Sequence, residues 1–149
     1  NVSIELAPSA EEAVKDADII TLSTTTTDPV IQGGWLKDGM HMNSIASATP
    51  QVRELDSTAI VKSKVIVDSK ESAMLESGDL LVPIAEGKIT AEHVYAEIGE
   101  IASGEKAGRT TDEEITLYKS MGLAIQDAAA ANWFYEKASE LGCGIELDL

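Results

Sequence analysis

The stretch "ADIITLSTTTTDPV", residues 17–30, contains the pattern that decides the fold of this chain. The apolar run Ile19–Leu22 has the length and composition of a buried strand, and five consecutive hydroxyl residues, Ser23–Thr27, follow it directly. Two interpretations are open. The hydroxyl cluster is either a solvated, threonine-rich turn, or it is a strand end that presents hydroxyl and backbone N–H groups to a ligand.

The composition is that of a water-soluble globular domain. The chain has 149 residues, of which 44% are hydrophobic and 25% are charged, which is sufficient for one domain with a core. No apolar run approaches the roughly 18 residues of a membrane span, so we expect no membrane partner. The single cysteine, Cys143, cannot form an internal disulfide and fits a reducing compartment, which favours a cytoplasmic location.

Charge and metal-ligand spacing exclude two further classes of function. The net charge of −15 argues against nucleic-acid binding, which needs clustered basic side chains, and is typical of a well-solvated acidic surface. The two histidines and one cysteine lie far apart without the spacing of metal ligands, so we expect no metal site. We interpret His41 and His93 as structural residues, and we expect Asn43 to satisfy backbone groups.

Outward from residues 17–30, short apolar runs alternate with helical patterns. Ser9 and Glu12 form a capping box that opens a short acidic helix, and Asp56 lies near the start of another. Asp68 and Ser69 read as the N-cap of a third. The alternation predicts an α/β fold with parallel strands in a sheet of three or four strands. We expect strands at 18–22, 40–45 and 64–69, a further strand at 1–6, and helices at 9–17, 54–63 and 71–79.

A long helical pattern closes the chain. Thr111 and Glu114 form a second capping box, and apolar residues at helical spacing continue from Asp112 to Leu141, where Gly142 ends the pattern. A helix of this span would be about 45 Å long at 1.5 Å per residue. It carries two apolar stripes, so we expect it to pack against another domain or a second copy through Trp133, Tyr135 or Leu141.

Six motifs in order carry a resemblance to a known family. They are the threonine-rich strand end, W-L-K-x-G, N-x-I-x-x-x-x-P-x-x-R-E-L, V-D-S, E-S-G-D-L and T-L-x-K-S-x-G-x-A-x-x-D. Together they make residues 10–141 resemble the C-terminal half of the ornithine cyclodeaminase/mu-crystallin family, which includes archaeal alanine dehydrogenases and ketimine reductases.

The resemblance implies a fold and a domain arrangement. Residues 1–110 would form the second half of an NAD(P)-binding Rossmann domain with a doubly wound parallel sheet, and residues 111–149 would form a C-terminal helix. Family members are about twice this length and place a substrate-binding and dimerisation domain before the Rossmann domain. No G-x-G-x-x-G stretch occurs here, and the chain does not begin with Met, so we expect a fragment. Its expected partner is a second copy or the N-terminal half.

The resemblance also implies which residues line the site. Thr24, Thr25, Ile45 and Ser47 would contact a nicotinamide dinucleotide, NAD or NADP, together with Lys119, which the helical pattern places early in the last helix. Ala48, Glu76 and Ser120 would line the substrate pocket. Without the resemblance, Lys119 would read as a solvated helical lysine, Glu76 as a helix-terminal carboxylate, and residues 46–48 as a tight turn before Pro50.

Ala48 narrows the expected reaction. Cyclodeaminases that act on ornithine carry an aspartate at the matching position, and alanine supplies neither a proton nor a charge for the substrate's amines. The resemblance therefore implies hydride transfer between the cofactor and the Cα of a small amino acid, keto acid or imine. The catalytic acid/base groups of the family belong to its N-terminal half and have no counterpart here. Two alternatives stay open: a non-catalytic, mu-crystallin-like protein that binds NADPH and a small ligand, and an inert truncated paralogue.

Overall fold

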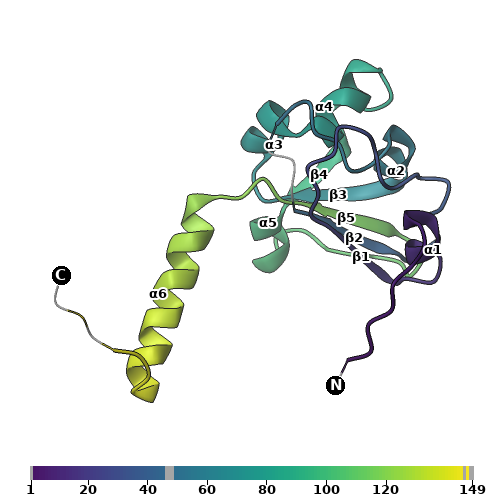
Figure 1. The fold of residues 1–149 in the computed structure, drawn as a ribbon. Coiled ribbons are helices and arrows are strands. Elements are labelled where there is room, and N and C mark those ends of the chain that lie inside the picture. The colour runs from purple at the N-terminus through teal and green to yellow at the C-terminus, as the bar shows by residue number, and fades with distance from the viewer. Residues whose placement is uncertain (1, 46–48, 146, 148–149) are drawn as a thin grey trace.

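The protein has an α/β fold built on a five-stranded parallel sheet (Figure 1). The computed structural model describes residues 2–45, 49–145 and 147. The strand order is β1-β2-β5-β3-β4, and each neighbouring pair is parallel. The strands are β1 Ile19–Leu22, β2 His41–Ser44, β3 Ser63–Val67, β4 Val94–Glu97 and β5 Ile115–Lys119.

The predicted α/β class is confirmed, and the sheet is larger than the three or four strands expected. The strands predicted at 18–22, 40–45 and 64–69 correspond to β1, β2 and β3. The central strands β3 and β5 are buried over most of their length, as expected for a parallel sheet that is covered by helices.

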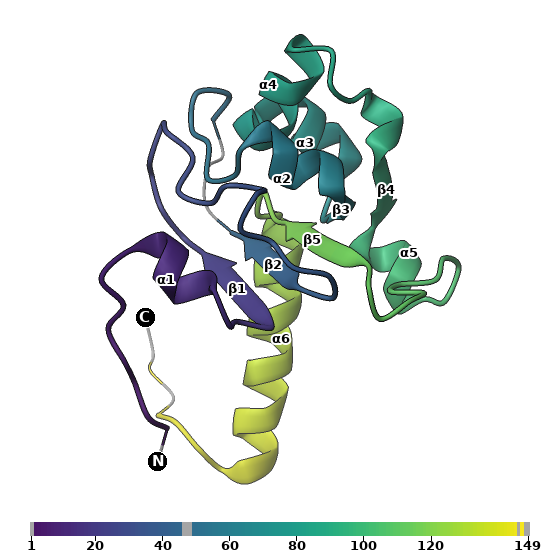
Figure 2. The ribbon, with the colours of Figure 1, turned by 90° about the vertical axis from the view of Figure 1, so that its right-hand side faces the viewer.

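Four helices contribute to the apolar layer on one face of the sheet. Side chains of α1 (Ala10–Val14), α2 (Ser57–Lys62), α3 (Lys70–Glu76) and α4 (Gly78–Ala85) join strand residues in one hydrophobic cluster. Figures 1 and 2 both show α2, α3 and α4 above the sheet. The short α5 (Ile98–Ala102) follows β4, which a 3-10 turn at Ala91–His93 precedes. The position of α2, α3 and α4 on one side is what crossovers of the same hand from β2 to β3 and from β3 to β4 would give.

Two predicted N-caps, Ser9 and Ser69, are confirmed, and Asp56, expected near the start of its helix, is the N-cap of α2. The Ser9 hydroxyl accepts from the N–H of Glu12, the Asp56 carboxylate from that of Ala59, and the Ser69 hydroxyl from that of Ser72. Each bond satisfies one of the orphan N–H groups at a helix start, which fixes where the helix begins.

The prediction of one continuous helix from Asp112 to Leu141 is wrong. Residues 115–119 form β5, and the last helix, α6, begins at Ala124 and ends at Leu141. The expected capping box does not open a helix, because the Glu114 carboxylate instead accepts from the N–H and the hydroxyl of Thr110. The segment "ITLYK" is rich in β-branched and aromatic residues, and it gains burial between β2 and β3 that a surface helix would not provide.

The predicted N-terminal strand is also wrong. Residues 2–7 have no regular structure, and Val2, Ile4 and Leu6 are exposed. Their alternating pattern suits a strand, but no strand of the described residues pairs with them, and an unpaired strand is not stable alone.

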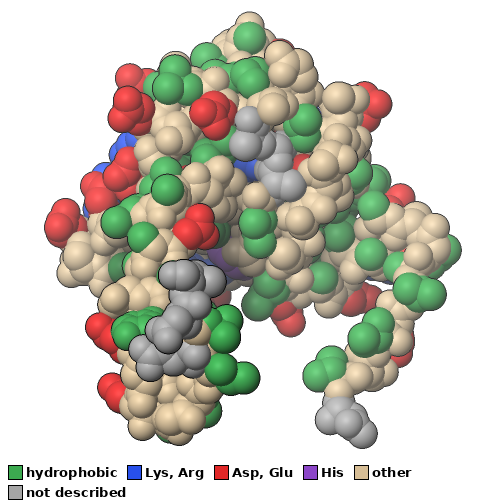
Figure 3. Space-filling view, turned by 60° about the vertical axis from the view of Figure 1, so that its left-hand side comes forward, with side chains coloured by type: hydrophobic (Ala, Val, Ile, Leu, Met, Phe, Trp, Pro, Cys, Tyr) green, Lys and Arg blue, Asp and Glu red, His purple; other side chains and the backbone are tan. Residues whose placement is uncertain are grey.

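Helix α6 extends away from the sheet, as Figures 1 and 2 show from two directions. None of its residues is buried, and its C-cap Gly142 adopts the left-handed conformation with φ 62°. Figure 3 shows hydrophobic side chains on α6 and on the extended N-terminal segment. Among the described residues, no helix is long and apolar enough to cross a membrane.

Candidate functional site

The carboxyl ends of four strands meet in one row at the edge of the sheet. Leu22 of β1 pairs with Ser44 of β2, Ser44 pairs with Lys119 of β5, and Lys119 pairs with Val67 of β3. The segments that leave these strands therefore start side by side. In parallel α/β sheets, ligands bind in the crevice outside this edge, so the row is the candidate site.

Glu54 is the first of three buried carboxylates at this edge, the others being Asp79 and Asp68. One of its oxygens, Oε1, accepts from the N–H of Thr24 at 2.6 Å and from the Thr24 hydroxyl at 2.9 Å. The other, Oε2, accepts from the Ser44 hydroxyl at 2.6 Å. The side chain is fully shielded from solvent. Glu54 thereby connects the end of β1 with the end of β2.

Asp79, near the start of α4, is the second buried carboxylate. Its Oδ1 accepts from the backbone N–H groups of Glu54 and Leu55 at 2.8 and 2.9 Å. Its Oδ2 lies 3.2 Å from Lys119 Nζ, and both side chains have no exposed surface. Lys119 Nζ also donates to the Ser44 hydroxyl oxygen at 2.9 Å. We call Glu54, Asp79 and Lys119 the buried charge cluster.

The hydrogen bonds of the buried charge cluster fit three ionised side chains. Every donor described at Glu54 and Asp79 is an N–H, a hydroxyl or the Lys119 ammonium, so both carboxyl groups act as acceptors. Two carboxylates and one ammonium have a formal sum of −1. Asp79 is paired with Lys119, and Glu54 is stabilised by the hydrogen bonds from Thr24 and Ser44, as buried charges require partners.

Glu54 and its neighbour Arg53 also position the threonine-rich segment that follows β1. Besides the side-chain bonds to Thr24, the Glu54 carbonyl accepts from the N–H groups of Val30 and Ile31, and the Arg53 N–H donates to the Thr26 carbonyl. The segment is thus held near both of its ends. Thr24 is half-buried and directs its donors inward to Glu54, whereas Thr25 is exposed to solvent. Of the two predicted threonine contacts, Thr25 has the freer hydroxyl.

Asp68, at the end of β3, holds the segment after β5. Its Oδ2 accepts from the Ser120 hydroxyl at 3.0 Å and from the N–H groups of Met121 and Gly122 at 2.8 Å each. Ser69 alone caps α3, so the prediction of an N-cap is right for Ser69, while Asp68 joins β3 to the start of the β5–α6 connection. The predicted pocket residue Ser120 is 9% exposed and is held by this bond.

The structure brings only some of the predicted site residues together. Thr24, Thr25, Ile45, Lys119 and Ser120 all lie at or beyond the carboxyl ends of β1, β2 and β5. Lys119 is the last residue of β5, so its predicted helical position is wrong. Ile45 is 52% exposed, and its N–H donates to the Leu22 carbonyl.

Three further predicted site residues are not part of these strand ends as described. Glu76 is exposed at the end of α3. Ser47 and Ala48 lie outside the described residues.

Four residues that build this edge were not predicted as site residues: Ser44, Glu54, Asp68 and Asp79. A usable signal was present, because Glu54 and Asp79 are charged residues next to apolar ones in "REL" and "GDLL". Charged residues are almost never fully buried unless they are paired. That Glu54 contacts Thr24, 30 residues away, and that Asp79 pairs with Lys119 cannot be read from such a local pattern.

Both histidines have structural partners, as predicted. His93 Nε2 lies 2.9 Å from the Ile60 carbonyl oxygen, and His41 lies between Thr116 and Asn43 on the sheet. The expectation for Asn43 is wrong, because its side chain bonds to those of His41 and Thr21 rather than to backbone groups. In the described part of the chain, no group of three metal-binding side chains could hold a metal ion.

Glu114 lies next to the opposite end of β5, just before Ile115. The Thr110 hydroxyl and N–H, together with the nearby Lys64 ammonium, lower the pKa of Glu114 to about 2. These contacts stabilise the carboxylate, but they lie far along the strand from Lys119. Glu114 is therefore part of the fold and not of the candidate site.

Comparison with known proteins identifies close relatives. The model of the ornithine cyclodeaminase/mu-crystallin family matches residues 1–142. A Delta(1)-pyrroline-2-carboxylate reductase of Bacillus cereus is 50% identical over 138 residues, covering 92% of this chain and 42% of that protein. An alanine dehydrogenase of Archaeoglobus fulgidus is 39% identical over 146 residues, covering 98% of this chain and 44% of that protein.

A solved structure has the same fold. The Delta(1)-pyrroline-2-carboxylate reductase of Thermococcus litoralis, in complex with NADH and L-proline, superposes with a TM-score of 0.87 at 48% identity. It is matched over 95% of this chain and 44% of its own. The present chain thus spans less than half the length of the relatives it matches.

Proposed function

The chain belongs to the ornithine cyclodeaminase/mu-crystallin family, and from this premise we propose that it forms the NAD(P)-binding part of an oxidoreductase. The proposed reaction is hydride transfer between a nicotinamide cofactor and the Cα of a small amino acid or imine. The observation that carries the proposal is the meeting of Thr24, Thr25, Ile45 and Lys119 at the carboxyl edge of β1, β2 and β5.

The residues at this edge fit a nicotinamide ring. Ile45 offers a partly exposed apolar surface, and the exposed Thr25 offers a hydroxyl, while the charges of Glu54 and Lys119 stay buried beneath them. Binding sites commonly combine an apolar surface with a few well-placed polar groups. When bound, the nicotinamide supplies or accepts the hydride. In our proposal Ile45 packs on the ring, Thr25 bonds its polar edge, and Glu54 keeps the threonine segment in place.

We further propose that the substrate is a cyclic imine carboxylate, with alanine and its keto acid as the second choice. The chain is 47–50% identical to four Delta(1)-pyrroline-2-carboxylate reductases and 39% identical to the alanine dehydrogenase. Ala48 supports this choice because it cannot act on the amines of ornithine. Ala48, Glu76 and Ser120 stay our proposed pocket residues, and the acid/base groups would come from the rest of the whole protein.

The direct test is a substrate panel with the whole protein. Oxidation of NADH and NADPH is followed with a cyclic ketimine or with pyruvate plus ammonia, and proline formation from ornithine is measured in parallel. We expect turnover of the ketimine and little or none of ornithine, because a missing acid/base group costs about 10²–10⁴ in rate. Robust proline formation from ornithine alone would overturn the substrate assignment. Dinucleotide binding without any turnover would favour the non-catalytic, mu-crystallin-like alternative.

A paired substitution tests the cofactor site itself. Thr25→Val removes an exposed hydroxyl and should weaken dinucleotide affinity about two- to tenfold, the range expected for one hydrogen bond. Thr27→Val is the matched control, because Thr27 is an exposed neighbour in the same segment. Equal affinities of the two variants would argue against a contact at Thr25.

For the partner, we propose that α6 packs against the N-terminal half of the same protein or against a second copy. The support is its exposed apolar side chains, including Trp133, Tyr135 and Leu141. An archaeal alanine dehydrogenase, a structure with bound NAD at 38% identity and a TM-score of 0.81, is described as a dimer.

A further inference from the structure

We propose that the buried charge cluster sets the relative affinity of the site for oxidised and reduced nicotinamide dinucleotide. This inference rests on the proposed function, because it requires the nicotinamide to bind at the carboxyl edge of β1, β2 and β5. It assigns to Glu54, Asp79 and Lys119 an electrostatic role that is distinct from their role in holding strand ends together.

The cluster lies directly beneath the proposed ring site. Glu54 accepts both donors of Thr24, the residue next to the proposed contact Thr25. Glu54 and Lys119 both hydrogen-bond to the hydroxyl of Ser44, which directly precedes the proposed contact Ile45. One layer of hydrogen-bonded groups therefore separates the charges from the proposed ring position.

The cluster is shielded from solvent and carries a net charge. Glu54, Asp79 and Lys119 have no exposed surface, so water and salt screen their field only weakly. Their formal charges sum to −1. The oxidised nicotinamide ring carries a positive charge and the reduced ring is neutral, so a net negative cluster stabilises the oxidised form relative to the reduced form.

The sign of the effect can be reversed by choice of residue. Glu54→Gln or Asp79→Asn brings the formal sum to zero and should weaken binding of the oxidised cofactor relative to the reduced one. Lys119→Met brings the sum to −2 and should have the opposite effect. For one unit charge in a partly polar interior, the ratio of the two dissociation constants should change on the order of tenfold.

Glu54→Gln is the variant that disturbs the fold least. The glutamine carbonyl oxygen can still accept from Thr24, and its amide can donate to the Ser44 oxygen. The Ser44 hydroxyl can then turn to Asp79 Oδ2, from which it already lies 3.4 Å away. The hydrogen bonds can thus be kept while the charge is removed. Asp79→Asn is a second, independent neutralisation, although its amide would face the Lys119 ammonium.

The experiment measures dissociation constants of the oxidised and the reduced dinucleotide for the whole protein by calorimetric titration. It compares the wild type with Glu54→Gln, Asp79→Asn and Lys119→Met. Glu71→Gln, a neutralised carboxylate exposed on α3, is the control. Circular dichroism and thermal unfolding establish which variants are folded. A merely structural role would weaken both forms of the cofactor equally and leave their ratio unchanged.

We expect the ratio of the dissociation constants, oxidised over reduced, to rise in Glu54→Gln and Asp79→Asn, to fall in Lys119→Met, and to stay unchanged in Glu71→Gln. An unchanged ratio in the folded variants, or a shift in the same direction for Lys119→Met as for Glu54→Gln, would overturn the inference while leaving the proposed function standing. Absence of dinucleotide binding by the wild type would overturn both.

Discussion

Gly78 shows how one residue fixes the position of Asp79. A Cβ atom at Gly78 would lie 2.3 Å from the Val52 carbonyl oxygen and 2.8 Å from that of Pro50. Because both neighbours are backbone atoms, they cannot turn away as a flexible side chain would. The contact brings the start of α4 against the loop that carries Glu54, so that the Asp79 carboxylate reaches the backbone N–H groups of Glu54 and Leu55.

Gly78→Ala should therefore destabilise the protein by about 1–3 kcal/mol or more, the usual cost of forcing extra volume into a packed site. Chemical denaturation gives the free energy of unfolding. Gly99→Ala is the control, since a Cβ at Gly99 in α5 meets no atom within 4 Å. If the two variants unfold alike, the close approach at Gly78 is not what holds this loop.

Glu114 makes a pH-dependent contribution to stability. Its pKa is lowered from 4.5 to about 2 by the Thr110 hydroxyl and N–H and by Lys64. A lowered pKa in the folded state means that the carboxylate stabilises the fold above pH 4.5, and that this contribution is lost as the pH falls toward 2. Glu114→Gln should lower the unfolding temperature near pH 6, and its difference from the wild type should shrink across that interval. A difference that is constant from pH 6 to pH 2 would contradict this assignment.

At the residue level, the positions of Thr25 and Ile45 at the sheet edge could be predicted from the sequence better than the buried residues beneath them. Thr25 and Ile45 follow strands that local pattern reveals, so their place at the sheet edge could be expected. Glu54 and Asp79 depend on partners that are distant in sequence, such as Thr24 and Lys119. A charged side chain can be buried only where such partners meet it in the folded structure. A single sequence does not show which distant residues these partners are.

At the level of elements, β5 was the least predictable part of the fold. Its residues fit two helical stripes as well as a strand, with Leu117 on one stripe and Ile115 and Tyr118 on the other, and a capping-box pattern preceded them. These residues form a strand because they pair with both β2 and β3, and this pairing buries Leu117 completely. By contrast, β1, β2, β3 and the N-caps of α1 and α3 followed from local composition.

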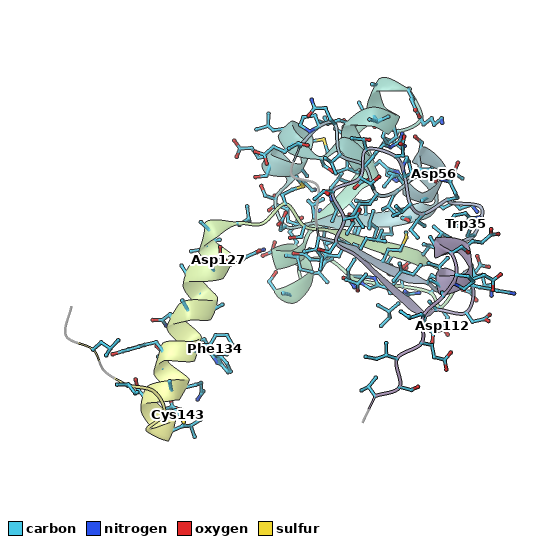
Figure 4. The ribbon with its side chains drawn as sticks, viewed as in Figure 1. Trp35, Asp56, Asp112, Asp127, Phe134 and Cys143 are labelled. Carbon is cyan, nitrogen blue, oxygen red and sulfur yellow. The ribbon has the colours of Figure 1, made fainter. Side chains whose placement is uncertain are left out.

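Helix α6 should behave differently from the sheet in the isolated 149-residue chain. Trp133, Phe134 and Tyr135 are 54%, 65% and 74% exposed, and Figure 4 shows Phe134 on the part of α6 that projects away from the sheet. An 18-residue helix without packing is marginally stable in water.

Hydrogen exchange at low protein concentration should therefore find α6 amides exchanging much faster than those of β2, β3 and β5. Amides of α5, a short helix next to the sheet, provide an internal comparison. Equal protection of α6 and the central strands would mean that a partner already covers the helix, and a concentration series would then show the association.

At the level of the whole molecule, the chain carries the proposed ring site but no recognisable phosphate-binding motif. No glycine-rich phosphate loop occurs in its sequence, and such a loop at a helix N-terminus normally holds the pyrophosphate of a dinucleotide. We expect the isolated chain to bind NADH with a dissociation constant on the order of 1 mM or weaker. Fluorescence titration tests this, with the whole protein as the reference. Micromolar binding by the isolated chain would show that another segment serves the phosphates.

The central position of β5 also dictates an order of events during synthesis. Its neighbours β2 and β3 do not pair with each other, so we expect the pairs β1-β2 and β3-β4 to stay separate until residues 115–119 emerge and join them. Such late, long-range pairing slows folding and leaves apolar strands open to misassembly meanwhile. A chain halted on the ribosome before Ile115 should therefore remain protease-sensitive, and one extended well past Gly122 should become resistant in a single step. Gradual acquisition of resistance would show that the two strand pairs mature on their own.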